Sequence, residues 1–220
     1  TYELVSLAQQ DKVDAYIPYQ RFENRLDLDA PRGTCITAGP PYNMEFRYQQ
    51  HQATLKAAEK VNEADAEFGK LFGRSYGGMV EAYRCDDAEA ILITLGSVAG
   101  TTRCVVDALR EQGKKVGLLK IRCMRPFPSK EVTEILKNAK FVGVLEKDIS
   151  FGFEGVVYTD VCSALKSAAV DVPAANYVGG LGGRSISKAD IEGIYTELLN
   201  GSAKVGEANF VNLRRDICGA

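Results

Sequence analysis

Two glycine-rich segments that each contain an arginine are the part of this sequence best suited to binding an anion. They are residues 73–78 (Gly-Arg-Ser-Tyr-Gly-Gly) and 179–184 (Gly-Gly-Leu-Gly-Gly-Arg). Glycine lets backbone N–H groups approach a ligand closely, and a guanidinium offers two parallel donors to phosphate or carboxylate. The second segment lacks the third glycine of the dinucleotide pattern and is not followed by Gly-Lys-Ser/Thr. It therefore predicts a phosphate contact, a tight connection or a subunit contact, whereas residues 73–78 predict an anion contact or a hinge.

Few side chains are available for acid–base chemistry. His51 is the only histidine, and it precedes Leu55 on one helical stripe, a position more typical of packing or capping than of catalysis. A general base would then be a carboxylate such as Glu146 or Asp148, which follow an apolar run directly, although such residues also cap helices or form ion pairs. Because the sequence contains no nucleophile elbow, His-Glu-x-x-His or complete phosphate loop, we predict no catalytic residue in this chain.

The cysteines and the charge balance exclude several classes of protein. None of the six cysteines belongs to a Cys-x-x-Cys pair, which argues against a zinc or iron–sulfur site within this chain and predicts reduced thiols and a cytoplasmic location. With 27 basic and 29 acidic residues the formal charge is −2, so nothing points to nucleic acid or a membrane surface. No apolar run approaches the roughly 18 residues of a spanning helix, and the start does not resemble a signal peptide. The cysteines are Cys35, Cys85, Cys104, Cys123, Cys162 and Cys218.

Short apolar runs that alternate with amphipathic segments predict the element order of an α/β domain. The runs are residues 90–95, 116–121, 141–145 and 174–178. Because the connections between them have helical periodicity, we expect parallel pairing and a doubly wound, mostly parallel sheet. Ligands bind at the carboxyl ends of strands in such sheets. The loops of interest are therefore 96–101, 123–129, 146–154 and 179–184, with Ser187 and Asp190 forming a capping box that opens the last helix.

The rest of the chain predicts an arm, a long helix and a tail. We expect a helix or turn over residues 5–16 within an extended arm or linker (1–47), a long helix with the glycine hinge (48–78), the α/β domain (79–202) and a C-terminal tail (203–220). The arm carries many large apolar groups, among them Tyr16, Phe22 and Phe46, which favours packing against another domain or subunit over a flexible linker.

Five ordered motifs together resemble the C-terminal half of the alpha subunit of pyruvate:ferredoxin oxidoreductase and its 2-oxoacid relatives. The resemblance implies a transketolase C-terminal-like domain preceded by its arm. It further implies a thiamine-diphosphate enzyme complex that decarboxylates a 2-oxoacid such as pyruvate, passes electrons through iron–sulfur clusters to ferredoxin and usually forms an acyl-CoA. The motifs lie at residues 42–51, 68–77, 95–101, 125–128 and 180–184.

The sequence contains neither the Gly-Asp-Gly motif that binds the diphosphate in such enzymes nor the cysteines that hold the clusters. The resemblance thus implies that thiamine diphosphate, magnesium and the clusters are carried by pyrimidine-binding, diphosphate-binding and ferredoxin-like partners, with ferredoxin and CoA serving the complex. This chain would be a structural or assembly domain, inactive alone. Candidate anion or interface contacts are Ser97, Thr101, Arg74, Arg125, Gly182, Gly183 and Arg184.

Two other functions remain open on the sequence. One is a stand-alone flavodoxin-like module that binds a nucleotide or phosphate through residues 179–184. The other is the C-terminal domain of a different thiamine enzyme, such as a 2-oxoacid dehydrogenase component. Each candidate arginine has an intramolecular ion pair as its alternative role, and Ser185 stands where the family usually has an acidic residue.

Overall fold

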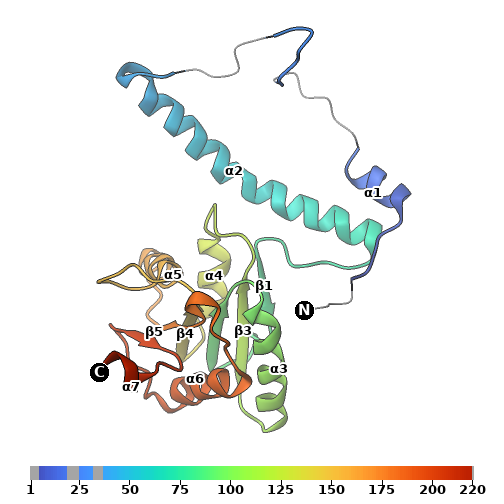
Figure 1. The fold of residues 1–220 in the computed structure, drawn as a ribbon. Coiled ribbons are helices and arrows are strands. Elements are labelled where there is room, and N and C mark those ends of the chain that lie inside the picture. Colours follow the sequence, from blue (N-terminus) through green and yellow to red (C-terminus); the bar gives the residue numbers. More distant parts are fainter. Residues whose placement is uncertain (1–4, 19–24, 32–36, 220) are drawn as a thin grey trace. The chain divides into compact units, whose positions relative to one another are not determined.

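The chain folds into two compact units, Thr1–Gly78 and Met79–Ala220. A computed structural model describes residues 5–18, 25–31 and 37–219, which are drawn as coloured ribbon in Figure 1. Cys35 and Phe22 lie outside the described residues.

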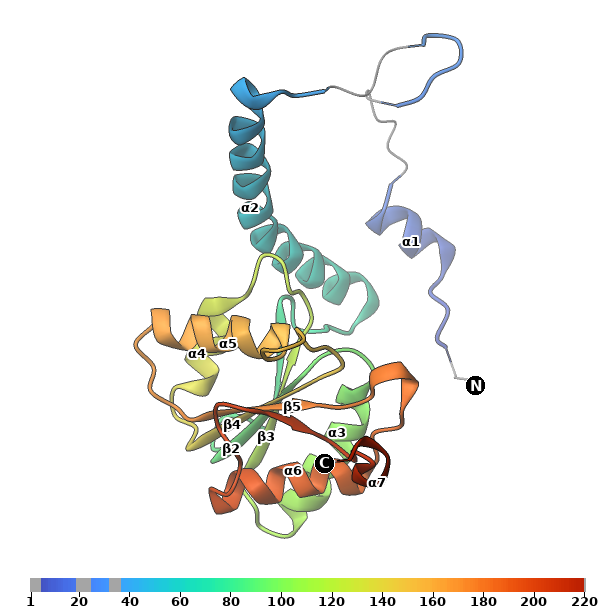
Figure 2. The same cartoon turned by 60° about the vertical axis from the view of Figure 1, so that its left-hand side comes forward.

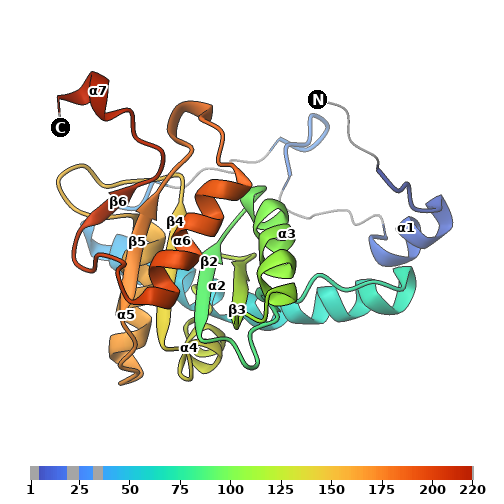
Figure 3. The same ribbon diagram turned by 90° about the horizontal axis from the view of Figure 1, so that it is seen from below.

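The second unit is built on a six-stranded sheet with the order β1-β3-β2-β4-β5-β6. Strands β2, β3, β4, β5 and β6 pair in parallel, whereas β1 pairs antiparallel with β3. Figure 3 shows the succession from β6 through β5, β4 and β2 to β3. The doubly wound, mostly parallel α/β fold is therefore confirmed. The strands are β1 (Val80–Tyr83), β2 (Ala90–Thr94), β3 (Val116–Ile121), β4 (Phe141–Glu146), β5 (Ala174–Val178) and β6 (Ala208–Phe210).

Helices cover both faces of this sheet. On one face lie α3 (Val98–Glu111) and α6 (Lys188–Asn200), and on the other lie α4 (Ser129–Leu136) and α5 (Val156–Ser167), as Figure 2 shows. Every residue of β2 and of β5 is buried. This explains why their sequences do not alternate between apolar and polar residues, since a strand covered by helices on both sides has no solvent-exposed face.

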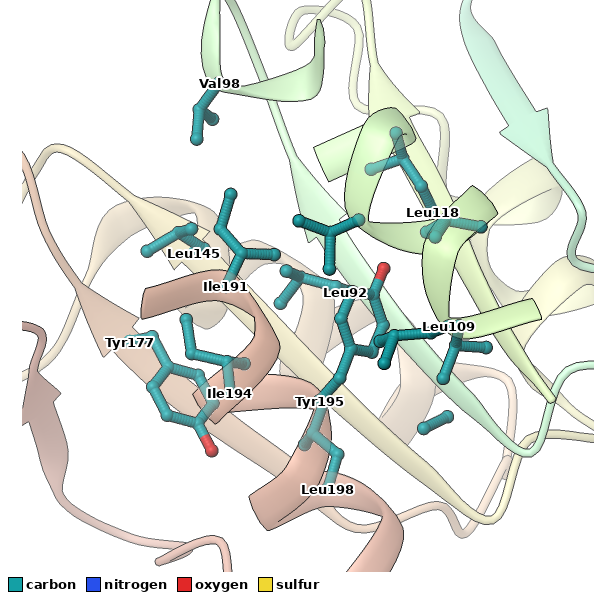
Figure 4. Close-up of a cluster of buried hydrophobic side chains, with 14 of the residues drawn as sticks. Leu92, Val98, Leu109, Leu118, Leu145, Tyr177, Ile191, Ile194, Tyr195 and Leu198 are labelled. Atoms are coloured by element: carbon teal, nitrogen blue, oxygen red, sulfur yellow. The ribbon is translucent and has the colours of Figure 1, made fainter. Parts of the chain in front are cut away.

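The cluster beneath α3 and α6 is one of the two parts of the core. Tyr195 of α6 is fully buried there, and its hydroxyl donates a hydrogen bond to the Gly117 carbonyl at 2.8 Å, so the polar end of the ring is satisfied. Figure 4 shows this ring between Leu92 and Leu198, with Val98 and Leu145 at the edge of the same cluster. The predicted capping box is also present, because Ser187 accepts from the Asp190 N–H while the Asp190 carboxylate accepts from the Ser187 N–H.

The two edge strands were not expected. Residues 203–220 were predicted to be a tail, but β6 pairs with β5 in register Asn176↔Ala208 to Val178↔Phe210, and the short helix α7 (Arg215–Cys218) follows. The antiparallel edge strand β1 lies in a stretch for which no element was predicted. Strands of three or four residues are too short to show an alternation of apolar and polar residues in the sequence. They are recognised only in the structure, where their backbones pair with a neighbouring strand.

The first unit consists of α1 (Gln10–Tyr16) and α2 (Pro40–Phe72). The prediction that the long helix begins near residue 48 was wrong, because α2 starts at Pro40 after the N-cap Gly39. Proline is well suited to the first helical turn, where its missing N–H has no partner to lose. The short helix α1 packs beside the C-terminal half of α2: the Tyr16 hydroxyl donates to the Ala64 carbonyl at 2.9 Å, and its ring lies edge-on to Phe68 with centroids 5.5 Å apart.

The glycine segment 73–78 folds back onto α2 through one carboxylate. Asp65 accepts hydrogen bonds from the Ser75 hydroxyl, from the Tyr76 N–H at 2.9 Å and from the Gly77 N–H at 3.2 Å. The Arg74 guanidinium lies over the Phe68 ring at 5.2 Å, and its Nε donates to the Tyr76 hydroxyl at 3.0 Å. The Ser75 hydroxyl and the two backbone N–H groups therefore donate to an anion that the protein itself supplies, whereas the Arg74 Nε donates to a hydroxyl.

We expect that Asp65→Ala releases this segment without unfolding α2. Loss of the acceptor should speed amide hydrogen exchange at Tyr76 and Gly77 by about tenfold or more, because each charge-assisted hydrogen bond contributes roughly 1.5–3 kcal/mol. The matched control is Glu67→Ala, which removes an exposed carboxylate from the same helix. Equal exchange rates in both variants would show that Asp65 does not hold the segment.

Candidate functional site

A crevice opens between the carboxyl ends of β2 and β4. After β2 the chain runs to α3 on one face of the sheet, and after β4 it runs to α5 on the other, so the two loops diverge. This is the topological switch point at which doubly wound sheets bind ligands. The cavity there has a volume of about 340 Å³ and is lined by Leu95, Gly96, Ser97, Val98, Met124, Leu145, Glu146, Lys147, Asp148, Val157 and Ile186.

The crevice is largely apolar, with its charged groups in one stretch of chain. Its apolar side chains come from the segments after β2, β3, β4 and β5. The charged groups Glu146, Lys147 and Asp148 follow one another at the end of β4. Of the three, Glu146 is 2% exposed, whereas Lys147 and Asp148 are exposed.

Glu146 serves as the N-terminal cap of α5. Its carboxylate accepts hydrogen bonds from the Val157 N–H at 2.8 Å, from the Tyr158 N–H at 3.2 Å and from the Asn176 side-chain amide at 2.9 Å. An acidic group is favoured at this end of a helix because the first N–H groups have no partner within the helix. Of the two roles left open by the sequence, capping is thus the one that the structure shows.

The backbone beside Glu146 is shaped to admit its carboxylate. Gly155 precedes α5, and a Cβ atom at that position would overlap the Glu146 side chain. The Gly155 N–H donates to the Asn176 side-chain carbonyl at 2.9 Å, so Asn176 of β5 contacts both the loop and the carboxylate. Burial raises the pKa of Glu146, and the hydrogen bonds from Val157, Tyr158 and Asn176 oppose that rise.

The predicted contact residues of the α/β unit lie on different segments of the chain. Ser97 lines the crevice, while Thr101 is half-buried one turn later on α3. The Arg125 guanidinium forms an ion pair with Asp160 at 2.7 Å. Arg74 belongs to the other unit. The intramolecular alternative thus holds for Arg125, and whether these residues also contact other domains stays a prediction.

The second glycine segment borders a smaller cavity of its own. Arg184 lines this cavity of about 210 Å³ together with Leu181 and residues of the β6 region. Its guanidinium donates to the Asn212 carbonyl at 3.1 Å. Gly182 and Gly183 are exposed and have φ angles of 63° and 84°, in the left-handed region that favours glycine.

Met124 and Lys147 lie in the loops 123–129 and 146–154 that the sequence indicated, although neither was singled out there, and Ile186 lies outside all of the indicated loops. Lys147 stands between the two carboxylates that the sequence singled out, so its position at a strand end was a usable signal. Met124 and Ile186 come from separate loops, and only the tertiary fold brings them together.

Metal-binding geometry is not found in the described part of the chain. Residues 5–18, 25–31 and 37–219 contain no group of three or more His, Cys, Asp or Glu side chains that could hold a metal ion. The five described cysteines are free thiols. Burial raises the pKa of Cys85 to about 12, and its thiol donates to the Leu118 carbonyl at 3.2 Å. No described helix is both long and apolar enough to cross a membrane.

We expect that Glu146→Gln destabilises the α/β unit by about 1–3 kcal/mol, because the new amide group places a donor against backbone N–H donors. The pH dependence should change as well. A carboxyl group whose pKa is raised in the folded state loses stability as the pH rises from about 4.3, its ordinary value, through the folded pKa. Urea unfolding between pH 4 and 8 should show this decline in the free energy of unfolding of the wild type. The decline should be smaller in the variant, because residue 146 no longer titrates.

The matched control is Asp148→Asn, which removes an exposed carboxylate two residues along. It should leave the free energy of unfolding within about 0.5 kcal/mol. If the Glu146 variant were equally stable, the capping role would be wrong.

The sequence also matches known proteins. Residues 88–191 match the family model "Pyruvate:ferredoxin oxidoreductase core domain II". The chain is 42% identical over 194 residues to pyruvate synthase subunit PorA of Methanothermobacter thermautotrophicus, covering 88% of this chain and 49% of that protein. It is 38% identical over 220 residues to PorA of Methanosarcina barkeri, covering 98% and 54%.

A third relative carries a different substrate in its name. Ketoisovalerate oxidoreductase subunit VorA of Pyrococcus abyssi is 36% identical over 199 residues, covering 90% of this chain and 50% of that protein. The chain therefore spans about half the length of these curated relatives. A solved 2-oxoglutarate:ferredoxin oxidoreductase from Magnetococcus marinus aligns at 19% identity with a TM-score of 0.43 over 60% of this chain and 21% of that one, a likeness on which no conclusion rests. Residues 88–191 therefore match core domain II of pyruvate:ferredoxin oxidoreductase, and most of the chain is similar to about half of the PorA and VorA subunits.

Proposed function

We propose that this chain is a structural and assembly domain of a thiamine-diphosphate-dependent 2-oxoacid:ferredoxin oxidoreductase. The complex would decarboxylate a 2-oxoacid such as pyruvate oxidatively and pass the electrons to ferredoxin. The observation that carries the proposal is the identity of 36–42% over most of the chain to subunits named for pyruvate synthase and ketoisovalerate oxidoreductase.

The chemistry of the described residues supports an assembly role over a catalytic one. The buried carboxylate at the switch point is engaged by α5 and Asn176. The described ranges contain no group of three or more His, Cys, Asp or Glu side chains that could hold a metal ion. Thiamine diphosphate, magnesium and iron–sulfur clusters would be held by pyrimidine-binding, diphosphate-binding and ferredoxin-like partners, and the complex would work in the cytoplasm with CoA as acyl acceptor.

The exposed apolar groups at the carboxyl edge of the sheet support contact with neighbouring domains. In the loop between β4 and α5, Phe151 is 95% exposed and Phe153 is 67% exposed. Leu181, between β5 and α6, is 42% exposed. Large apolar side chains left in water on one edge are typical of a surface that another protein covers.

The proposal is tested by isolating the chain from the cells that make it. An affinity tag on the chain should recover an assembly that reduces ferredoxin in the presence of a 2-oxoacid and CoA. The purified 220-residue chain should show no turnover and no saturable micromolar binding of thiamine diphosphate with magnesium, measured by calorimetry.

Other outcomes favour the other candidates. A monomer that retains a nucleotide would favour the flavodoxin-like module, and an assembly that reduces NAD would favour a 2-oxoacid dehydrogenase. Turnover of a 2-oxoacid by the isolated chain would overturn the proposed assembly role.

We also propose that Ser97, Thr101, Arg74, Arg125, Gly182, Gly183 and Arg184 contact neighbouring domains. We expect Arg184→Ala to weaken binding of the purified chain to the other polypeptides of the assembly by roughly fivefold, the size of one partly exposed charged contact. Surface plasmon resonance measures the affinity. The control is Lys188→Ala, an exposed cation at the start of α6. Equal affinity of both variants would remove Arg184 from the interface.

A further inference from the structure

The crevice at the ends of β2 and β4 has no occupant in the proposed assembly role. Its volume of about 340 Å³ lies within the range of small-molecule sites. Val98, Leu145 and Val157 line it from the core side, and each is buried. Because these side chains belong to rigid elements, the apolar part of the cavity is preformed.

Lys147 gives the crevice one unpaired cation. Its ammonium group forms no hydrogen bond or ion pair within the described part of the chain. Its stem passes close to Gly180, where a Cβ atom would lie 2.9 Å from the Lys147 Cε. Gly180 has a φ of 76°, so a glycine both forms the turn and makes room for the lysine.

The two carboxylates that line the crevice, Glu146 and Asp148, differ in how strongly they would repel an anionic ligand. Glu146 is compensated by three donors, the N–H groups of Val157 and Tyr158 and the amide of Asn176. Asp148 lines the crevice and is exposed, with no partner inside the described ranges. A ligand that is anionic would be attracted by Lys147 and opposed by Asp148.

We propose that the crevice binds a small organic carboxylate with an apolar body. The carboxylate faces Lys147, and the body lies among Val98, Met124 and Leu145. The buried carboxylate at the crevice is engaged by the start of α5 and by Asn176. Aliphatic and aromatic carboxylic acids share the chemistry that this crevice would recognise.

The test compares 3-phenylpropionate with 3-phenylpropionamide, which share a shape and differ in charge. Calorimetry with the full chain should give an affinity for the carboxylate roughly fivefold higher than for the amide, the size of one exposed charge pair. Lys147→Gln should abolish that difference, and Asp148→Asn should enlarge it. The control Lys130→Gln, on an exposed position of α4, should leave it unchanged.

A second readout locates the ligand. Methyl resonances of Val98, Leu145 and Val157 should shift on titration, and Ser97→Phe, which places a ring at the cavity wall, should abolish binding of both compounds. Equal affinity for the two compounds, retention of the preference in Lys147→Gln, or shifts confined to other residues would each overturn the proposal. Because calorimetry uses this chain alone, its outcome is independent of whether the chain joins an oxidoreductase.

Discussion

The buried carboxylate of Glu146 is the constraint on which the architecture of the switch point depends. Burying a charge is costly unless donors compensate it, and three donors from α5 and β5 offset part of that cost. The same contacts fix where α5 begins and how β5 lies beside β4. Gly155 follows from this arrangement, since only glycine leaves space for the carboxylate. The loops diverge because the chain leaves β2 and β4 toward opposite faces of the sheet, and the Glu146 contacts hold the start of α5 at that edge.

The central sheet could be predicted from the sequence because its strands are covered on both faces. β2 and β5 are buried throughout, so each appears as an uninterrupted apolar run. The edge strands β1 and β6 have one free side and four or three residues, which leaves almost no pattern. The start of α2 was missed for a different reason. None of the side chains in its first turns is buried, so the sequence there has no apolar stripe that would indicate Pro40 as the first helical residue.

The position of the candidate site was predictable, but the roles of its residues were not. Loops after β2 and β4 were among those expected to matter because ligands bind at the carboxyl ends of parallel strands, and both line the crevice. Whether Glu146 acts as a base or a cap depends on α5, which lies ten residues further along the chain. In the same way, the glycines and the arginine of residues 73–78 predicted an anion contact. The anion is Asp65 of the preceding helix, which the sequence pattern did not indicate.

Internal partners occupy most of the groups that suggested anion chemistry. Asp65 takes the donors of one glycine segment, Asp160 pairs with Arg125, and the Asn212 carbonyl accepts from Arg184. In the described residues, these groups are therefore engaged by partners within their own unit. What it presents at the carboxyl edge is apolar surface, such as Phe151, together with the crevice and its single unpaired lysine. Apolar surface and a shaped cavity are what contact with neighbouring domains and binding of a small molecule both require, more than reactive side chains.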